Sequence, residues 1–176
     1  MSEIAASAGV ARSTIYATFG SRAGLVAGLA DDTLQRAGLA EVIAEYRRSD
    51  AVSALELSLR ANCRMYAVDH RVFARLLILA QVDPDAAGPL ARWQADRAAG
   101  MADLARRLAD QARLRSDVSV ERAADVLWLL TGFWAFDELF SGRGLDANAC
   151  AETVIDIARS TLLRGAKLRR PGPTPI

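Results

Sequence analysis

The sequence predicts an all-α protein, and three observations lead to that prediction. Of the 176 residues 35 are alanine, the residue with the highest helix propensity. None of the five prolines falls within residues 1–83 or 90–170, so no helix breaker interrupts either stretch. Apolar residues recur every three to four positions, as in amphipathic helices, which predicts about eight helices and no strand.

Two short helices are expected at the N-terminus, over residues 2–8 and 12–19. Ser2 is a candidate N-cap of the first, and Gly9 interrupts the pattern after it. Gly20 and Ser21 form a turn, with Ser21 as the N-cap of a long helix over residues 22–47. That helix would be about 40 Å long.

Three further helices are expected in the centre of the chain. Ser49-Asp50 is a break and a new helix cap, after which residues 55, 59, 63 and 66 place apolar side chains on one helix face. A shorter helix follows over residues 72–81. The segment from Asp83 to Pro89 is the clearest loop of the chain, and a long helix over residues 90–113 comes after it.

The C-terminal part is predicted to hold two helices, over residues 120–140 and 147–164. The first is apolar around its whole circumference and must be covered on more than one side. The second has a single apolar face. Three prolines in the last six residues predict a disordered tail over residues 167–176.

Composition and charge exclude several classes of protein. The 22 basic residues balance 21 acidic ones, so the chain neither coats nucleic acid by bulk charge nor forms an acidic tail. The longest nearly apolar stretch, residues 123–136, contains Asp125 and is too short for a membrane span. Cys63 and Cys150 have no partner at metal or redox spacing, and no signal peptide is visible. We therefore expect a cytoplasmic protein.

No catalytic set, cofactor or metal site is expected, so the sequence does not predict an enzyme. His70 is the only histidine, and its neighbour Asp69 faces elsewhere on a helix. No Ser-His-Asp arrangement, glycine-rich phosphate loop or pair of carboxylates stands out. Asp137 and Glu138 are interpreted as solvated or capping groups.

The first 25 residues contain the spacing of a helix-turn-helix. Ala5 is small enough for two helices to cross closely, and Gly9 supplies the left-handed backbone of a short turn. Ile15, with Ile4 and Val10, packs the second helix on the first. In such a motif the second helix lies in the major groove of DNA.

The stretch IAASAGVARSTIYATFGSRAGL, residues 4–25, resembles the signature of tetracycline-repressor-like (TetR) transcription regulators. The signature combines an I-A-x-x-A-G-V turn with a short recognition helix that ends T-hydrophobic-Y-x-x-F. Arg22 stands where the family most often has Lys. Beyond these 22 residues the chain resembles the family only in the number, order and length of its helices.

The resemblance implies a role in DNA binding for seven residues beside the turn residue Gly9: Ala11, Arg12, Ser13, Thr14, Tyr16, Thr18 and Arg22. The first four begin the recognition helix, where Arg12 suits a bidentate contact to guanine. Arg22, at a helix N-terminus, suits a phosphate. Alternatively, Tyr16 is a core aromatic like Phe19, and the two arginines are ordinary solvated charges.

Members of the family have a further helix before this motif, and the sequence starts at their second helix. We therefore expect an incomplete three-helix DNA-binding head, with Ile4, Val10, Ile15 and Phe19 partly bare. The expected division places the DNA-binding domain with its connecting helix at residues 1–46. A regulatory and dimerisation domain follows at residues 47–166.

The resemblance also implies a homodimer and a pocket for a small hydrophobic effector. Helices 120–140 and 147–164 are the candidates for the dimer interface, unless the first is merely the centre of a monomer core. The candidate ligand-binding residues are Asn62, Tyr66, Trp93, Trp128 and Phe133, whose aromatic members could instead be core filler.

The function that follows is a transcriptional regulator, most simply a repressor that leaves a palindromic operator on double-stranded DNA when an effector binds. The alternative is a helical dimer that binds a small molecule or partner but no DNA, because its first helix is missing. An all-helical enzyme comes third, since no catalytic set is visible.

Overall fold

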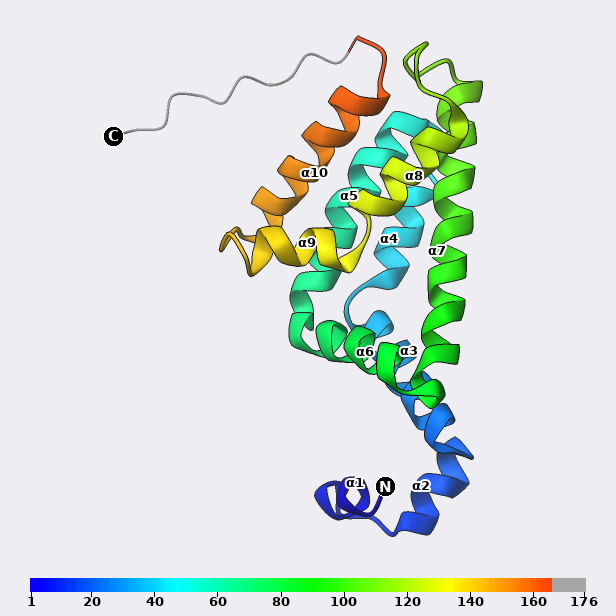
Figure 1. Ribbon diagram of the computed structural model, residues 1–176, viewed down its shortest axis with the longest axis vertical. Helices are drawn as coiled ribbons and strands as arrows, with labels where there is room; N and C mark the ends of the chain where they lie inside the picture. Colours follow the sequence, from blue (N-terminus) through cyan, green and yellow to red (C-terminus); the bar gives the residue numbers. More distant parts are fainter. Residues whose placement is uncertain (166–176) are drawn as a thin grey trace, which may run out of the picture.

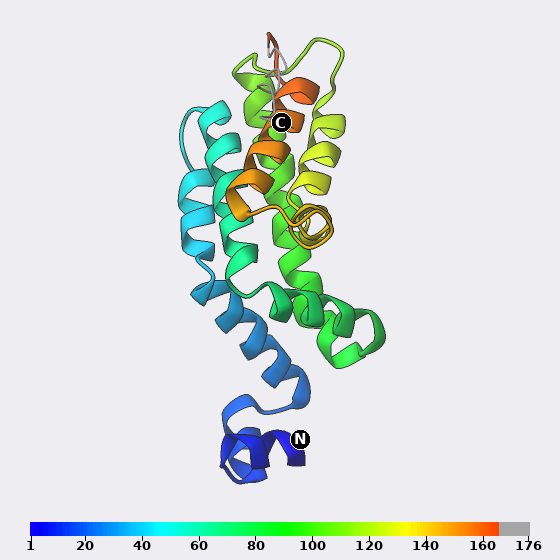
Figure 2. The same ribbon diagram turned by 90° about the vertical axis from the view of Figure 1, so that its left-hand side faces the viewer.

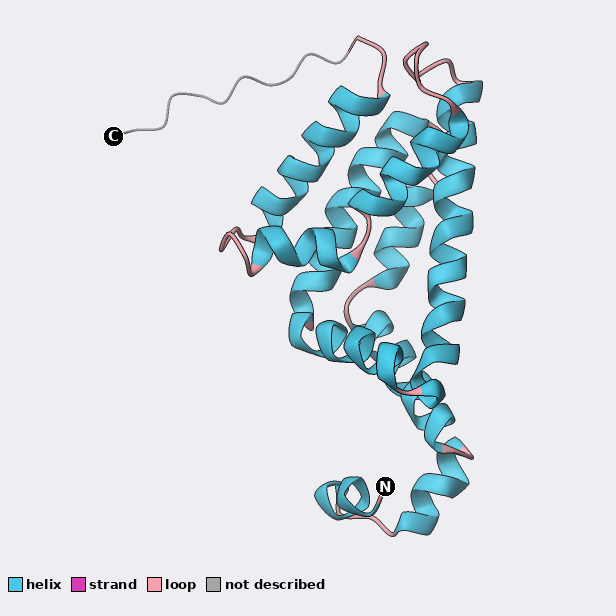
Figure 3. Ribbon diagram, in the orientation of Figure 1, coloured by secondary structure: helices cyan, strands magenta, loops and turns pink. Residues whose placement is uncertain are grey.

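The computed structural model describes residues 1–165, which fold almost entirely into helices (Figure 3). Within these residues the only β-type pairing is an isolated bridge between Leu114 and Leu163. The all-α prediction is thereby confirmed, whereas the tail at 167–176 lies outside the described residues. Ten helices lie in the described range: α1 (Ser2–Ala8), α2 (Arg12–Phe19), α3 (Arg22–Arg36), α4 (Leu39–Tyr46), α5 (Ala51–Val68), α6 (His70–Val82), α7 (Pro84–Asp110), α8 (Val120–Leu130), α9 (Phe133–Phe140) and α10 (Ala147–Leu162).

The helices form an elongated molecule with a small head at one end (Figures 1 and 2). The head consists of α1 and α2, and α3 leads from it into a larger bundle. In the bundle α4, α5 and α7 run roughly along the long axis, whereas α6 and α9 lie across it. The closest packing joins α4 to α5, α7 to α8 and α10 to α5.

The core lies within the bundle and is built from the apolar faces that the sequence pattern predicts. Helix α5 is buried on more than one side, because α4, α7 and α10 all pack on it. Its central side chains Leu55, Leu59 and Tyr66 are inaccessible or nearly so. Both cysteines are buried, as expected of small apolar residues.

The long helix expected over residues 22–47 is wrong, because the chain breaks it at Ala37-Gly38. Gly38 has a φ of 93°, a left-handed conformation that glycine adopts without steric cost. The break turns the chain, so that α4 lies along α5 instead of continuing α3 (Figure 1).

The single helix expected over residues 120–140 is also broken, at Thr131-Gly132. Gly132 is extended, with φ −73° and ψ 143°, and acts as the N-cap of α9. Thr131 closes α8 by donating its hydroxyl to the Leu127 carbonyl at 2.8 Å. Because of this break α9 crosses the bundle, and the backbone around Thr131 becomes available to other helices.

The loop predicted from Asp83 to Pro89 is helical instead. Asp83 caps α7 by accepting a hydrogen bond from the Asp85 amide at 3.0 Å, and Pro84 occupies the first helical position. A proline is tolerated there because that residue has no intrahelical donor role. Pro89 lies within the helix, where it removes one backbone hydrogen bond without ending it.

Two of the three predicted helix caps are present. Ser21 accepts a hydrogen bond from the Gly24 amide at 3.0 Å, and Asp50 accepts one from the Ser53 amide at 2.8 Å. Ser2 is not a cap, since Met1 holds that position without a side-chain bond. No described helix has the length and apolar character that crossing a bilayer demands.

Candidate DNA-binding face and effector cavity

The head has the geometry of a helix-turn-helix. Ala5 of α1 and Ile15 of α2 are both only 5% exposed and form the small interior of the motif. Gly9 ends α1 with a φ of 66°, the left-handed conformation that the sequence predicts. The Val10 amide then donates to the Ala5 carbonyl at 3.0 Å and fixes the turn.

All seven side chains predicted to contact DNA are exposed: Ala11, Arg12, Ser13, Thr14, Tyr16, Thr18 and Arg22. Arg12 and Tyr16 share one face of α2, with Nη2 3.4 Å from the phenol oxygen. The Thr18 hydroxyl is directed to its own helix, where it donates to the Thr14 carbonyl at 2.9 Å. Ala11 caps α2 without a side-chain hydrogen bond, so no side chain of the cap covers the amides of the first turn.

Arg22 has partners that the sequence did not reveal. Its guanidinium forms an ion pair with Asp83, whose side chain is 11% exposed, and lies 3.8 Å from the Asp85 carboxylate. The contact joins the start of α3 to the corner between α6 and α7. A phosphate contact by Arg22 therefore competes with an ion pair inside the molecule.

The apolar residues of the head are partly bare, as expected, with one exception. Ile4, Val10 and Phe19 are exposed, whereas Ile15 is buried against Ala5. Phe19 lies over α3, where a Cβ on Gly28 would come within 3.0 Å of its ring. It is thus a half-covered side chain packed against α3, in agreement with the expectation that it is partly bare.

A cavity of about 340 Å³ lies among α4, α5, α7 and the junction between α8 and α9. Its inner part is formed by buried residues of α5, including Asn62 and Met65, and by Thr131. Ile43, Arg47 and Asp96 are exposed and form its rim. A cavity of this size, mostly apolar with a few convergent polar groups, is typical of small-molecule sites.

The structure brings two of the five candidate ligand-binding residues to this cavity, Asn62 and Trp93. Tyr66 lies behind it, fully buried, and donates its hydroxyl to the Thr131 carbonyl at 3.1 Å. Phe133 packs edge to face on Tyr66, with ring centroids 5.3 Å apart. Trp128 is exposed and lies under the guanidinium of Arg97.

Sequence reasoning missed the wall that α4 provides, including Leu39, Val42 and Tyr46, because these residues were assigned to one continuous connecting helix. It also missed Arg97, because nothing in the pattern of the helix over residues 90–113 distinguishes this arginine from the others. The signal for the first was Gly38, the residue at which the direction of the chain changes.

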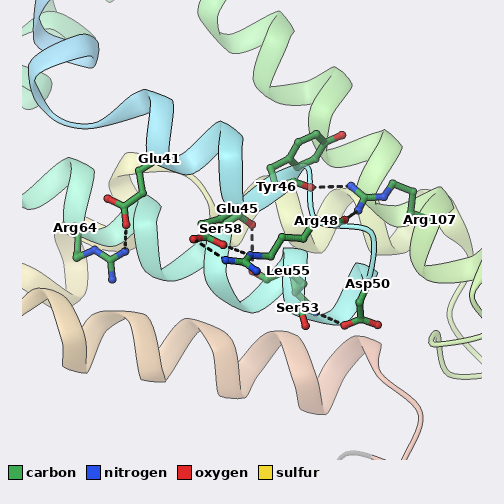
Figure 4. Close-up of polar contacts among 10 residues, drawn as sticks. All are labelled: Glu41, Glu45, Tyr46, Arg48, Asp50, Ser53, Leu55, Ser58, Arg64 and Arg107. Carbon is green, nitrogen blue, oxygen red and sulfur yellow. Dashed lines mark hydrogen bonds and ion pairs between the residues drawn. The ribbon is translucent and has the colours of Figure 1, made fainter.

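Helix α4 is held to both of its neighbours by charged side chains (Figure 4). Arg64 of α5 contacts Glu41 at 2.5 Å. Arg107 of α7 donates to the Tyr46 carbonyl at 2.8 Å and also to the Arg48 carbonyl, at the end of α4. Tyr46 donates its hydroxyl to Asp103 at 2.5 Å, and burial together with this bond raises the pKa of Tyr46 to about 12.

His70 and Asp137 are in contact, which corrects the interpretation of Asp137 as a solvated or capping group. Nε2 of His70 lies 2.5 Å from Oδ1 of Asp137 and 3.1 Å from the hydroxyl of Ser141. A catalytic triad needs the carboxylate and the hydroxyl on opposite ring nitrogens, but here both lie at Nε2. The cluster therefore joins α6 to α9 and lacks the geometry of a nucleophilic triad.

Helices α8, α9 and α10 carry large apolar side chains that are exposed in this chain, although the ring of Trp128 is partly covered by the guanidinium of Arg97. Leu129 is 66% exposed, and Trp128, Trp134 and Ile157 are exposed as well. On the opposite side of α8, Ala123 and Leu127 are completely buried. Helix α8 is thus apolar on both sides, with only one of them packed in this chain.

Comparison with known proteins gives one match. The family model for bacterial regulatory proteins of the tetR family matches residues 1–29, which comprise α1, α2 and the first half of α3. The comparison with curated proteins found no match, and neither did the comparison with solved structures. The matched segment contains the whole helix-turn-helix described above, so residues 1–29 are similar to the N-terminal DNA-binding region of tetR-family regulatory proteins.

Proposed function

We propose that this protein is a repressor that binds a palindromic operator as a homodimer and leaves it when a small molecule occupies the cavity. The observation that carries the proposal is the continuity between cavity and head. Helix α4 forms one wall of the cavity, and only Ala37 and Gly38 separate it from α3, which follows the recognition helix α2. A shift of α4 is thereby transmitted to the head.

In this proposal α2 lies in the major groove, with Ala11, Arg12, Ser13 and Thr14 directed to bases and adjacent phosphates. Arg12 reads a guanine, and Tyr16 beside it contacts the backbone of the DNA. Arg22 contacts a phosphate, which takes the place of the Asp83 carboxylate in its ion pair. Phosphate contacts fix the register of the helix, whereas base contacts determine the sequence that is bound.

The proposed dimer covers the apolar surface of α8, α9 and α10 with the same surface of a second copy. Trp128, Leu129, Trp134 and Ile157 support it, because a patch of large apolar side chains on one face typically marks an interaction site. A two-fold axis at this face would present two recognition helices to successive major grooves, about 34–36 Å apart.

The effector acts by population shift, because it binds best to the conformer in which the cavity accommodates it. In that conformer α4 moves relative to α5 and α7, and the two heads lose the spacing that the operator requires. The division into residues 1–46 and 47–166 stays a prediction. If it holds, α4 links the two parts, since it ends the first and lines the cavity of the second.

Selection from a random pool of duplex DNA, at moderate and at raised salt, tests the proposal. We expect enrichment of a palindrome whose affinity falls steeply with salt, because phosphate contacts release counterions. The same selection with Arg12→Ala should lose preference at one base pair of each half-site. No enrichment by the wild-type protein would contradict the proposal and favour the alternative, a helical dimer that binds a small molecule or partner without DNA.

A further inference from the structure

Arg97 carries a charge that no carboxylate of the described residues neutralises. Its Nε and Nη2 donate to Oε1 of Gln94 at 3.1 and 2.9 Å. Its Nη1 donates to the Trp128 carbonyl at 2.8 Å and to the Thr131 hydroxyl at 2.9 Å. All of these acceptors are neutral, and within residues 1–165 no carboxylate oxygen lies within ion-pair distance of this guanidinium.

This arrangement is costly for a side chain that is largely removed from water. Burial lowers the pKa of Arg97, because desolvation disfavours the charged form. The face of Trp128, 3.4 Å from the guanidinium carbon, offers partial compensation through a cation–π contact. Buried charges are normally paired, and Arg64 and Arg107 on neighbouring walls both lie near carboxylates.

Arg97 is one of the residues that line the cavity. One of its two Nη2 hydrogens has no acceptor among the described residues and is available to a ligand. In the same cavity Val42, Trp93 and Met101 provide an apolar wall. At the rim, the positive charge of Arg47 roughly offsets the negative charge of Asp96, and both side chains are exposed. Arg97 therefore determines the net charge inside the cavity.

We propose that the cavity binds an apolar organic acid whose carboxylate pairs with Arg97 and whose apolar body lies between α4 and α7. This inference rests on the effector role of the cavity proposed above and names the chemical class of the effector. A carboxylate and a guanidinium form charge-assisted hydrogen bonds, about twice as strong as neutral ones. The volume of about 340 Å³ lies at the lower end of the range for small-molecule sites, which favours a small acid over a large amphiphile.

Binding of the acid would also alter the junction between α8 and α9. Arg97 now donates to the Trp128 carbonyl and the Thr131 hydroxyl, both at the end of α8. A carboxylate competes for the same N–H groups. The acid is thereby linked to the helices that form the proposed dimer face, in addition to its contact with α4.

Direct titration of the full chain without DNA tests the inference. Octanoate, decanoate and 4-phenylbutyrate are compared with the alcohols of the same carbon skeleton, by calorimetry and by the intrinsic tryptophan fluorescence, to which Trp93 in the cavity wall contributes. We expect the acids to bind about tenfold or more tightly than their alcohols, as a charged hydrogen bond predicts. Arg97→Gln should abolish this preference, whereas Arg97→Lys, which keeps the charge, should retain part of it.

Arg92→Gln is the matched control, because Arg92 is an exposed arginine of the same helix that does not line the cavity. Melting curves of every variant establish that it is folded, and the comparison of acid with alcohol in the wild-type protein needs no variant. Equal affinity for acids and alcohols, no binding of either, or acid binding unchanged in Arg97→Gln would each overturn the inference. Because the titration contains no DNA, its outcome does not test operator binding. Failure to select an operator, in turn, does not test binding of the acid, so the two proposals fail independently.

Discussion

Of the proposed DNA-binding residues, Arg12 is the one to which we assign the most direct role in sequence recognition. Its guanidinium is exposed on α2 beside the Tyr16 hydroxyl and lies 5.5 Å from the centre of that ring. The tyrosine thus restricts the arginine to one face of the helix before DNA arrives, which lowers the conformational entropy that binding costs.

Replacing Arg12 by alanine should therefore weaken binding to the operator by about 1–3 kcal/mol and relax specificity at one base pair per half-site. The measurement is fluorescence anisotropy with the selected operator and with operators substituted at each position. Arg92→Ala, at an exposed arginine of α7 outside the head, is the control. A uniform loss across all sequences would show that Arg12 contacts phosphate and not a base.

In the proposed complex with DNA, a phosphate competes with Asp83 for Arg22. An ion pair with one exposed partner contributes little to stability, about 0–1 kcal/mol, so a phosphate can displace the carboxylate. Asp83→Asn should strengthen binding to operator and random DNA alike, by a few-fold, and asparagine preserves the cap of α7. Arg22→Ala should weaken both and reduce the salt dependence.

The double variant distinguishes competition from a general effect on the fold. If Asp83 acts only through Arg22, Asp83→Asn has no effect on DNA affinity once Arg22 is alanine. The anisotropy measurements at two salt concentrations give all four affinities. If Asp83→Asn still increases DNA affinity in the presence of Arg22→Ala, Asp83 does not act by competing for Arg22.

At the scale of elements, the corner between α2 and α3 depends on a close approach that only glycine permits. A Cβ on Gly24 would lie 2.0 Å from the carbonyl oxygen of Phe19, which belongs to the backbone and cannot rotate away. Gly24→Ala should thus open the corner and destabilise the head by about 1–3 kcal/mol, the usual cost of overpacking.

Gly88→Ala in α7 is the matched control, because a Cβ there meets nothing within 4 Å and alanine is the better helix former. Amide hydrogen exchange of α2 and thermal melting report the two effects. We expect faster exchange in α2 only for Gly24→Ala. Equal exchange in both variants would mean that the corner adjusts at no cost.

The contact between His70 of α6 and Asp137 of α9 should make the free energy of unfolding depend on pH in the acidic range. Burial raises the pKa of Asp137, but hydrogen bonds from His70 and Ser141 outweigh it, and the net pKa lies below its ordinary value of 3.8. A carboxyl group with a lowered pKa stabilises the fold above its unfolded pKa, and this contribution is lost as the pH falls through the folded value.

Asp137→Asn should accordingly lower stability at pH 6 by about 1 kcal/mol and flatten its decline below pH 4. Urea unfolding at a series of pH values measures both. Glu138→Gln, a change at the neighbouring exposed carboxylate, is the control. If the slope below pH 4 is the same in Asp137→Asn and in the wild-type protein, another group carries the dependence.

The elements also show how much the sequence predicts. Local signals were sufficient for α2, whose bounds at Arg12 and Phe19 agree with the expectation, and for the left-handed turn at Gly9. They failed at Gly38, Gly132 and the segment after Asp83. A glycine in a helical pattern is compatible with continuation or with a break, and packing of α4 on α5 selects the break.

The sites follow the same division. The exposed face of α2 was predictable, because it depends on residues close in sequence. Of the residues that line the cavity, the sequence predicted only Asn62 and Trp93. The other walls are positioned by the helix breaks before α4 and after α8, which the sequence did not predict. The partners of Arg22 and Arg97 lie on distant segments, and no local spacing reveals them.

For the whole molecule, recognition of a palindrome requires that two heads be held at a fixed distance. The head and the apolar surface of α8 and α10 lie at opposite parts of the elongated chain (Figures 1 and 2). In the proposed dimer, a change at that surface should therefore alter operator binding by weakening dimerisation and not by contact with DNA. Leu129, 66% exposed on α8, is the most accessible large apolar side chain of the surface.

Leu129→Arg should convert the proposed dimer to a monomer, because two unpaired charges would be buried at the interface. Val82→Arg is the matched control, since Val82 is 76% exposed and lies at the corner between α6 and α7. Light scattering after gel filtration measures the mass, and anisotropy measures binding to a full operator and to a half-site. We expect Leu129→Arg to lose its preference for the full operator while half-site binding stays at the wild-type level, and Val82→Arg to lose neither. The expected loss of operator preference depends on the burial of Leu129 between two copies of the chain. A wild-type protein that is monomeric at micromolar concentration, or a Leu129→Arg variant that is still dimeric, would therefore exclude this surface as the interface.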